Sequence, residues 1–264
     1  MRVGVIGCGA IGSVIVRAAR LEGFAEIVAL YDKHVEKAQK LAENAFVAEN
    51  FDEFIDIDMD VVVEAASQQA VEAYAEKILE RADLMMMSVG ALANDELLNR
   101  IERAAKKNNR RIYLPSGAVA GLDALKSVSS VADEVVLTTR KNPASLKGAP
   151  FFDIYGINPD EIKEETLLFE GSARQAVKLF PQNINVAAAV SLAGIGFDRT
   201  KVRIIADPKI KTNIHEVRVK GEFGEIVAIT NNVPSQQNPK TSYLAALSAV
   251  RTLKNIGQRI VVGT

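Results

Sequence analysis

Short apolar runs alternate with amphipathic stretches through the first half of the chain. Residues 1–6, 26–31, 60–66, 84–89 and 111–114 form such runs, and the stretches between them carry apolar residues three and four positions apart. Short apolar runs bounded by turn residues are typical of strands, and the longer spacing is typical of helices. Strands that alternate with helices form βαβ units, so we predict a parallel sheet with helices on both faces.

The second half of the chain shows another pattern. Strands are predicted over 134–139, 201–206, 215–220 and 225–230, and the last two are joined by a four-residue turn that begins and ends with glycine. A turn of this kind is typical of an antiparallel hairpin. The segment 142–159 is rich in Pro, Gly and Asn and is predicted to be a loop. We therefore predict a second α/β domain with a mixed or antiparallel sheet.

The two patterns meet near Pro115-Ser116-Gly117. We expect a first domain over residues 1–116 and a second over 117–238. A last helix over 239–256 is expected to return to the first domain. Its predicted core-facing residues are Leu244, Leu247, Val250 and Leu253.

Three glycines follow the first strand in the spacing Gly7-x-Gly9-x-x-Gly12 and open the next helix. Such a hexapeptide is weak evidence alone, but here a second strand follows and ends in Asp32, about 20 residues after the last glycine. Gly7 would allow a tight turn, Gly9 the close approach of a pyrophosphate, and Gly12 close packing of helix on strand. The first domain is therefore predicted to be a Rossmann domain that binds a dinucleotide.

The start of this helix and Asp32 are expected to hold two parts of that cofactor. The N–H groups around Ala10 and Ile11 have no partner within the helix and would meet the phosphates. Asp32 would bind the ribose hydroxyls and disfavour a 2′-phosphate, which Lys33 and His34 beside it could still tolerate. The predicted cofactor is NAD, with NADP left open. The alternative is that the glycines only form a turn and Asp32 caps the next helix.

Small residues follow the later strands of the first domain. They include Ala65-Ala66-Ser67, the stretch 88–92 and the stretch 115–121. Ligands of open α/β sheets bind beyond the carboxyl ends of the strands, so these residues, Ala66 among them, are expected to line the nicotinamide half of the site. The alternative is that small residues simply suit short loops.

His215 is the candidate acid or base. A period of two places it on the same strand face as Val217 and Val219, the face expected to be buried. A structural core histidine fits this pattern as well as a catalytic one, and both interpretations stay open. Imidazole is the side chain that titrates near neutral pH without perturbation, which suits proton transfer. The other histidine, His34, is expected at a solvated helix start.

The last helix carries a candidate substrate site at its beginning. Asn238 is predicted to cap this helix and Pro239 to occupy its first turn. The Lys240 ammonium group, the hydroxyl groups of Thr241 and Ser242, and the helix N–H groups could then hold a carboxylate. The alternative is plain helix capping beside an exposed lysine.

Composition narrows the function classes. The 264 residues have a formal net charge of −1, so the chain offers no bulk attraction for nucleic acid or an anionic membrane. One cysteine, Cys8, excludes an intrachain disulfide, and with two histidines it leaves no predicted metal site. The chain has no apolar run near the ~18 residues of a membrane span and no secretory leader pattern. We expect a cytoplasmic protein.

The chain resembles the L-aspartate dehydrogenase family over essentially its whole length. The motifs that carry the resemblance are Pro115–Asp123, Phe180–Ala187, Asp207-Pro208 with Asn213-Ile214-His215, and Asn238–Ser242. The resemblance implies a Rossmann domain followed by an α/β domain with substrate and dimer contacts, and so a homodimer. It implies that Ala120 and Asn185 contact the nicotinamide cofactor and that His215 is the active-site residue. The plan is similar to homoserine dehydrogenase and dihydrodipicolinate reductase, although the reductase's paired histidines are absent.

The reaction implied by the resemblance is oxidation of L-aspartate with NAD(P)⁺ to iminosuccinate. This imine hydrolyses to oxaloacetate and ammonia, or feeds quinolinate formation in NAD biosynthesis. Two alternatives stay open at this point. One is a dehydrogenase or imine reductase for another small amino or keto acid, and the other is a non-catalytic dinucleotide sensor.

Overall fold

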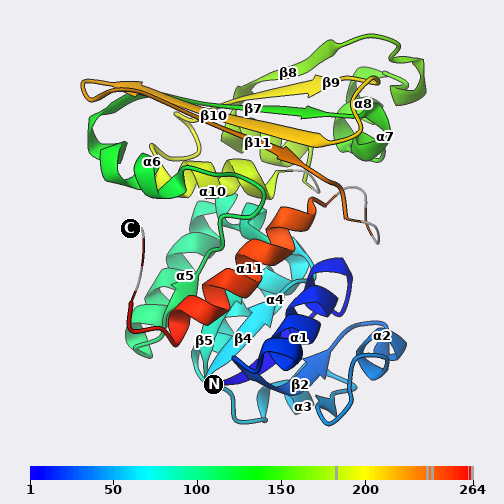
Figure 1. Cartoon of the computed structure of the whole chain (residues 1–264), viewed down its shortest axis with the longest axis vertical. Coiled ribbons are helices and arrows are strands. Elements are labelled where there is room, and N and C mark those ends of the chain that lie inside the picture. The colour runs from blue at the N-terminus through cyan, green and yellow to red at the C-terminus, as the bar shows by residue number, and fades with distance from the viewer. Residues whose placement is uncertain (182–183, 236–237, 239–240, 261, 263–264) are drawn as a thin grey trace. The chain divides into compact units, whose positions relative to one another are not determined.

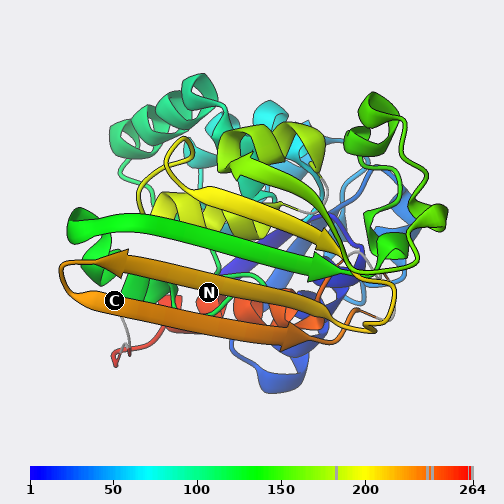
Figure 2. The same ribbon diagram turned by 90° about the horizontal axis from the view of Figure 1, so that it is seen from above.

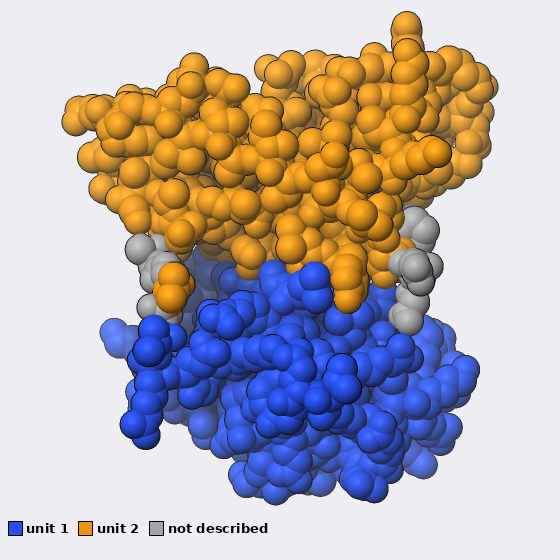
Figure 3. All heavy atoms as spheres, in the orientation of Figure 1, with its two compact units in different colours: residues 1–115, 245–261 blue, residues 116–244, 262–264 orange. Residues whose placement is uncertain are grey.

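The computed structural model describes residues 1–181, 184–235, 238, 241–260 and 262 (Figures 1 and 2). The chain divides into two compact units (Figure 3). Unit 1 comprises residues 1–115 and 245–261, and unit 2 comprises residues 116–244 and 262–264. Among the described residues, no helix has the length and apolar character needed to span a membrane.

Unit 1 is built on a six-stranded sheet in the order β3-β2-β1-β4-β5-β6, in which neighbouring strands run parallel. The chain starts in the middle of the sheet, moves outward to β3 and then crosses to the other side of β1. This order is that of a Rossmann domain, and the predicted parallel sheet is confirmed. The strands are β1 (Arg2–Ile6), β2 (Glu26–Tyr31), β3 (Phe46–Val47), β4 (Val61–Glu64), β5 (Asp83–Met86) and β6 (Ile112–Tyr113).

Helices lie between these strands in the chain, and one more comes from its C-terminal part. They are α1 (Ala10–Glu22), α2 (Val35–Gln39), α3 (Phe51–Ile55), α4 (Gln68–Leu79), the 3₁₀ turn η1 (Val89–Ala93), α5 (Asp95–Lys107) and the C-terminal α11 (Tyr243–Ile256). Side-chain oxygens cap three of them at their N-termini. Asn50 accepts from the Glu53 N–H at the start of α3, Ser67 from the Ala70 N–H at the start of α4, and Asn94 from two N–H groups at the start of α5.

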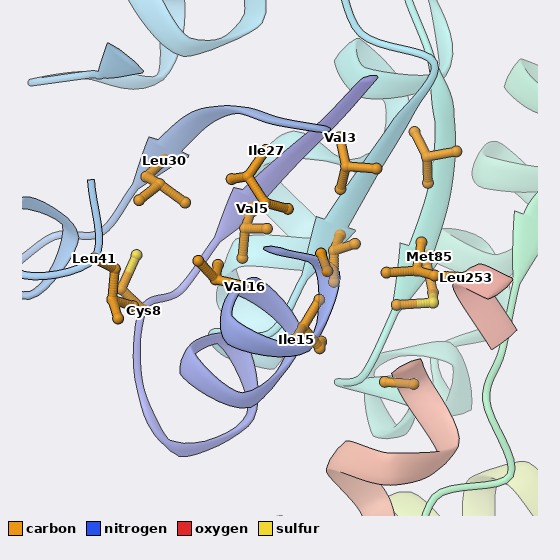
Figure 4. Close-up of a cluster of buried hydrophobic side chains, with 14 of the residues drawn as sticks. Val3, Val5, Cys8, Ile15, Val16, Ile27, Leu30, Leu41, Met85 and Leu253 are labelled. Atoms are coloured by element: carbon orange, nitrogen blue, oxygen red, sulfur yellow. The ribbon is translucent and has the colours of Figure 1, made fainter. Parts of the chain in front are cut away.

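The core of unit 1 joins the sheet to α1 and α11 (Figure 4). Val3 and Val5 of β1 pack with Ile15 and Val16 of α1, and Leu253 of α11 belongs to the same cluster. The predicted face of the last helix is partly wrong. Ala246, Ala249, Val250 and Leu253 are buried, whereas Leu244 and Leu247 are exposed by 36% and 42%. The buried face follows positions i, i+3, i+4 and i+7, with alanines where the sequence suggested leucines.

Unit 2 contains a five-stranded sheet in the order β11-β10-β7-β9-β8 (Figure 2). Only β7 and β9 pair parallel, and the other neighbours pair antiparallel, so the sheet is mixed. The predicted hairpin is present, and it joins β10 to β11. The strand β8 was missed by the sequence analysis because its residues are partly buried without alternation. The strands are β7 (Ala132–Lys141), β8 (Thr166–Ser172), β9 (Lys201–Ala206), β10 (Asn213–Gly221) and β11 (Gly224–Asn232).

The predicted loop over 142–159 is also wrong in part, since it contains two short helices, α7 (Pro143–Leu146) and α8 (Pro150–Tyr155). Each begins with a proline, whose fixed backbone angle and missing N–H suit the first turn of a helix. The Asn142 side chain caps α7 by accepting from the Ala144 N–H. The other helical elements of unit 2 are α6 (Leu122–Val128), η2 (Ser129–Val131), η3 (Pro159–Glu161), α9 (Ala173–Leu179) and α10 (Asn185–Ala193).

Candidate functional site

The three glycines after β1 have different reasons to be glycine. Gly7 has a φ of +93°, and a Cβ there would lie 2.6 Å from the Ala65 carbonyl group. A Cβ on Gly12 would overlap the Gly7 carbonyl oxygen, so α1 packs too closely on the loop for any side chain. A Cβ on Gly9 would meet no protein atom within 4 Å. The fold therefore requires Gly7 and Gly12, whereas Gly9 leaves open space beside its backbone, as a bound pyrophosphate needs.

Asp32 is fixed beside this loop at the end of β2. Its Oδ2 accepts a hydrogen bond from the Cys8 N–H at 2.8 Å, and its Oδ1 accepts one from the His34 N–H at 2.9 Å. The capping alternative fails, because the N-cap of α2 is His34 and makes no side-chain cap bond. Burial and the Asp32 charge raise the pKa of the Cys8 thiol to about 12, so this thiol stays protonated and unreactive near neutral pH.

A cavity of about 690 Å³ lies within unit 1 at the carboxyl ends of β1, β2 and β4. A groove at this end of a Rossmann sheet is where dinucleotides bind. Ala10 and Ile11 begin α1 directly after the loop and are partly exposed. The residues present thus fit a nicotinamide dinucleotide. The cavity is lined by Ile6, Gly7, Gly9, Tyr31, Asp32, Lys33, Lys37, Ala65, Ala66, Ser67, Gln69, Ala70, Ala73 and Tyr74.

Glu64, which the sequence analysis missed, holds two loops of this region. It ends β4 and is 1% exposed. Its Oε1 accepts from the Ala66 and Ser67 N–H groups, both at 2.8 Å, and from the Ser88 hydroxyl at 2.9 Å. Its Oε2 accepts from the Ser88 N–H at 3.0 Å. Burial raises the pKa of Glu64, and these four donors oppose that shift. The sequence signal that points to Glu64 is an acidic residue near the end of an apolar strand run.

We expect Glu64→Gln to lower the free energy of unfolding by about 1–3 kcal/mol and to weaken NADH binding. The amide NH₂ group must face either the Ser88 N–H or the pair at Ala66 and Ser67, so at least one buried donor loses its acceptor. Thermal unfolding and NADH fluorescence titration measure the two effects. The exposed Glu72→Gln on α4 is the control. Equal stability and affinity in both variants would show that Glu64 positions nothing.

His215 lies on the buried face of β10 in unit 2, with 2% of its surface exposed. Its Nδ1 is 3.0 Å from the Thr139 hydroxyl oxygen on β7, and the two residues are paired across the strands. Burial, and then the charge of Lys141, lower the pKa of His215 to about 3. The imidazole is therefore neutral near neutral pH. When Nδ1 carries the proton and donates to Thr139, Nε2 is free to accept a proton.

Other polar residues share the face of His215. Lys141 follows Thr139 by two positions on β7, and Asn213 precedes His215 by two on β10; both are buried. The Asn213 Nδ2 donates to the Ser242 hydroxyl at 3.3 Å, which joins one predicted substrate residue to this face. We call Thr139, Lys141, Asn213, His215 and Ser242 the β7–β10 cluster. The sequence analysis missed Lys141 because the predicted strand ended at residue 139.

Ala120 lies in a segment that is hydrogen-bonded to β11. The Ala118 carbonyl oxygen accepts from the Thr230 hydroxyl at 2.7 Å and from the Asn232 side-chain amide at 3.0 Å. Thr230 is the strand partner of His215, so this segment is tied to the strand beside the candidate base. Ala120 itself is exposed.

The remaining predicted residues are placed as follows. Asn185 is exposed at the first position of α10. The described part of α11 begins at Tyr243, so Asn238 is not its N-cap; its carbonyl oxygen instead accepts from the Thr241 N–H at 2.9 Å. Thr241 is partly exposed, and Lys240 lies outside the described residues. In the part of the chain that the structure describes, no group of three His, Cys, Asp or Glu residues could hold a metal ion.

Comparisons with known proteins cover the whole chain. Residues 7–115 match the NAD-binding domain of homoserine dehydrogenase, and residues 123–256 match the C-terminal part of aspartate dehydrogenase. The chain is 49% identical to the L-aspartate dehydrogenase of Methanosarcina barkeri and 48% identical to that of Methanosarcina mazei, each over 100% of both proteins. The crystal structure of aspartate dehydrogenase from Thermotoga maritima has 32% identity and a TM-score of 0.79, over 100% of this chain and 99% of that one.

Proposed function

Because this chain belongs to the aspartate dehydrogenase family, we propose that it oxidises L-aspartate to iminosuccinate with NAD⁺ as the preferred cofactor. As a member of this family it is an amino-acid dehydrogenase that works with a nicotinamide dinucleotide. The observation that carries the choice of substrate is the full-length identity to proteins named L-aspartate dehydrogenase.

Unit 1 supplies the cofactor site in this proposal. The loop from Gly7 to Gly12 and the start of α1 hold the pyrophosphate, and Asp32 binds the adenosine ribose. When bound, the cofactor supplies the hydride acceptor of the reaction. Both Asp32 oxygens accept hydrogen bonds from main-chain N–H groups, which holds the carboxylate in place beside the glycine loop.

Unit 2 supplies the proton transfers. The substrate ammonium group must lose a proton before Cα can give up a hydride, and His215 accepts it through Nε2. Thr139 holds the ring through Nδ1, and in the tautomer with the proton on Nδ1 its hydroxyl oxygen accepts from Nδ1–H. The same imidazole then assists the water that hydrolyses the imine to oxaloacetate and ammonia. We further propose that the imine feeds NAD biosynthesis and that unit 2 carries the substrate contacts and those of a homodimer.

We expect Asp32→Asn to lower the preference for NAD⁺ over NADP⁺ by about 10- to 100-fold in kcat/KM. The substitution removes the negative charge that repels a 2′-phosphate, while Lys33 and Lys37 in the same cavity keep their attraction for it. Steady-state kinetics with both cofactors measure the ratio. Asp133→Asn, at an exposed position on β7, is the control. An unchanged ratio would remove Asp32 from cofactor selection.

A substrate panel tests the proposed activity. L-Aspartate, L-homoserine, L-alanine and L-malate are each incubated with NAD⁺ at alkaline pH, and the absorbance of the reduced nicotinamide is followed. The proposal predicts that L-aspartate has the highest kcat/KM. A higher value for another substrate would support a different dehydrogenase, and tight NADH binding without turnover would support a sensor.

A further inference from the structure

The β7–β10 cluster contains a buried cation that the proposed proton transfers do not use. Lys141 ends β7 and is 3% exposed. The alternation along this strand buries Leu137, Thr139 and Lys141 on one face, so the lysine side chain follows the face that carries His215 across the sheet. The end of β7 is not buried on both faces, because Arg140, one position earlier, is partly exposed.

Burial of this ammonium group has a cost. Taking a charge out of water is unfavourable, so a buried ammonium group needs polar or charged groups around it. Burial lowers the pKa of Lys141 to about 8, which still leaves much of it charged at neutral pH. Its charge also acts on the imidazole, because it contributes to the lowered pKa of His215. The two groups are therefore within electrostatic reach of each other.

The surroundings of Lys141 suit an anion. Thr139, Asn213 and Ser242 of the same cluster offer hydroxyl and amide groups that can donate to carboxylate oxygens. Helix α10 carries no ionisable side chain between Asn185 and Ala193. Among the described residues on the strands beside β7, the titratable groups include His215 on β10 and, after β9, Asp207 and Lys209. The Asp207 N–H donates to the Lys141 carbonyl oxygen, and the Asp207 carboxylate accepts from the Lys209 N–H.

We propose that Lys141 binds a carboxylate group of the substrate beside His215 and so selects acidic amino acids. The inference rests on the proposed function, which needs a cationic contact for a dicarboxylate. A carboxylate paired with Lys141 would also reduce the field that this lysine exerts on His215. The pKa of the imidazole would then rise, and the base would become stronger when the substrate is in place.

The experiment measures binding of succinate, a dicarboxylate without an amino group, so that its outcome is separate from turnover. Calorimetric titration in the presence of NADH compares the full-length wild type, Lys141→Met and Lys201→Met. Lys201 is the control, because it lies on the exposed face of the same sheet in an ion pair with Glu134. Methionine has a similar length and relieves a buried charge, so we expect Lys141→Met to fold, and thermal unfolding verifies this.

We expect Lys141→Met to weaken succinate binding about 10- to 100-fold and to raise the KM for L-aspartate more than it lowers kcat. Lys201→Met should match the wild type. The wild type should also lose succinate affinity as the pH rises through and above the Lys141 pKa of about 8, because only the protonated lysine attracts the anion. A bound carboxylate raises the pKa of Lys141 in the complex, so the loss continues until the pH reaches that higher value. Lys141→Met should lack this pH dependence.

The inference is overturned if Lys141→Met binds succinate like the wild type, or if wild-type succinate affinity is flat over this pH range. With either result, the proposed function still stands if the wild type oxidises L-aspartate. If the wild type oxidises no L-aspartate while Lys141→Met loses succinate binding, the activity is wrong and the carboxylate site at Lys141 stands.

Discussion

His215→Ala should lower kcat for L-aspartate oxidation by about 10²- to 10⁴-fold, the usual contribution of general acid–base catalysis. The imidazole is held by Thr139 through Nδ1, and alanine offers no group that could take the substrate proton. The glycine loop and Asp32 are untouched by the change, so the dissociation constant for NADH should stay near that of the wild type. Steady-state kinetics and NADH fluorescence titration measure the two quantities.

His34→Ala is the matched control, since it removes the other histidine at the exposed start of α2. It should leave kcat within a small factor of the wild-type value. If His215→Ala turned over L-aspartate at a near-normal rate, His215 would be a structural core histidine. The alternation along its strand fits that interpretation as well.

Gly12→Ala should be the most damaging single substitution in unit 1. The new Cβ would overlap the Gly7 carbonyl oxygen, which is backbone and cannot rotate away. Either α1 or the loop must shift, so we expect the free energy of unfolding to fall by roughly 3 kcal/mol or more. Binding of NADH should be lost together with the stability. Thermal unfolding of the variant with and without NADH measures both.

Gly9→Ala makes the same chemical change three residues earlier and separates packing from ligand binding. Its Cβ would meet no protein atom within 4 Å, so stability without cofactor should be unchanged. NADH affinity should nevertheless fall, because the methyl group occupies the space into which the pyrophosphate fits. Wild-type NADH affinity in Gly9→Ala would place the pyrophosphate elsewhere, and wild-type stability in Gly12→Ala would contradict the packing argument.

The fold of the first half was predictable because its signals are local. Each buried parallel strand is a short apolar run, and the spacing from Gly7 to Asp32 lies within one βαβ unit. The prediction failed where local signals have two meanings. Pro143 and Pro150 belong to a segment whose Pro, Gly and Asn content predicts a loop, yet each begins a short helix. Ala246 and Ala249 lie on the buried face of α11 beside Val250 and Leu253. Leu244 and Leu247, which the spacing of apolar residues favoured, are exposed.

The candidate site was predictable only in part, because its missed residues act through contacts between distant segments. Glu64 looks like the polar end of a strand until Ser88, 24 residues later, is seen to donate to it. Thr139 and His215 are 76 residues apart and meet only through the pairing of β7 with β10. The alternation of residues within one strand does not show which residue of another strand pairs with it. The roles of Ala120, Asn185 and Thr241 stay predictions.

The transfer of hydrogen from the substrate to the cofactor tests the central claim most directly. L-Aspartate carrying deuterium at Cα is incubated with NAD⁺ and the wild-type protein, and the reduced cofactor is analysed by mass spectrometry. The account predicts that the reduced nicotinamide carries the deuterium and that oxaloacetate and ammonia appear in equal amounts. Reduced cofactor without deuterium, or no reduction with L-aspartate at all, would contradict it.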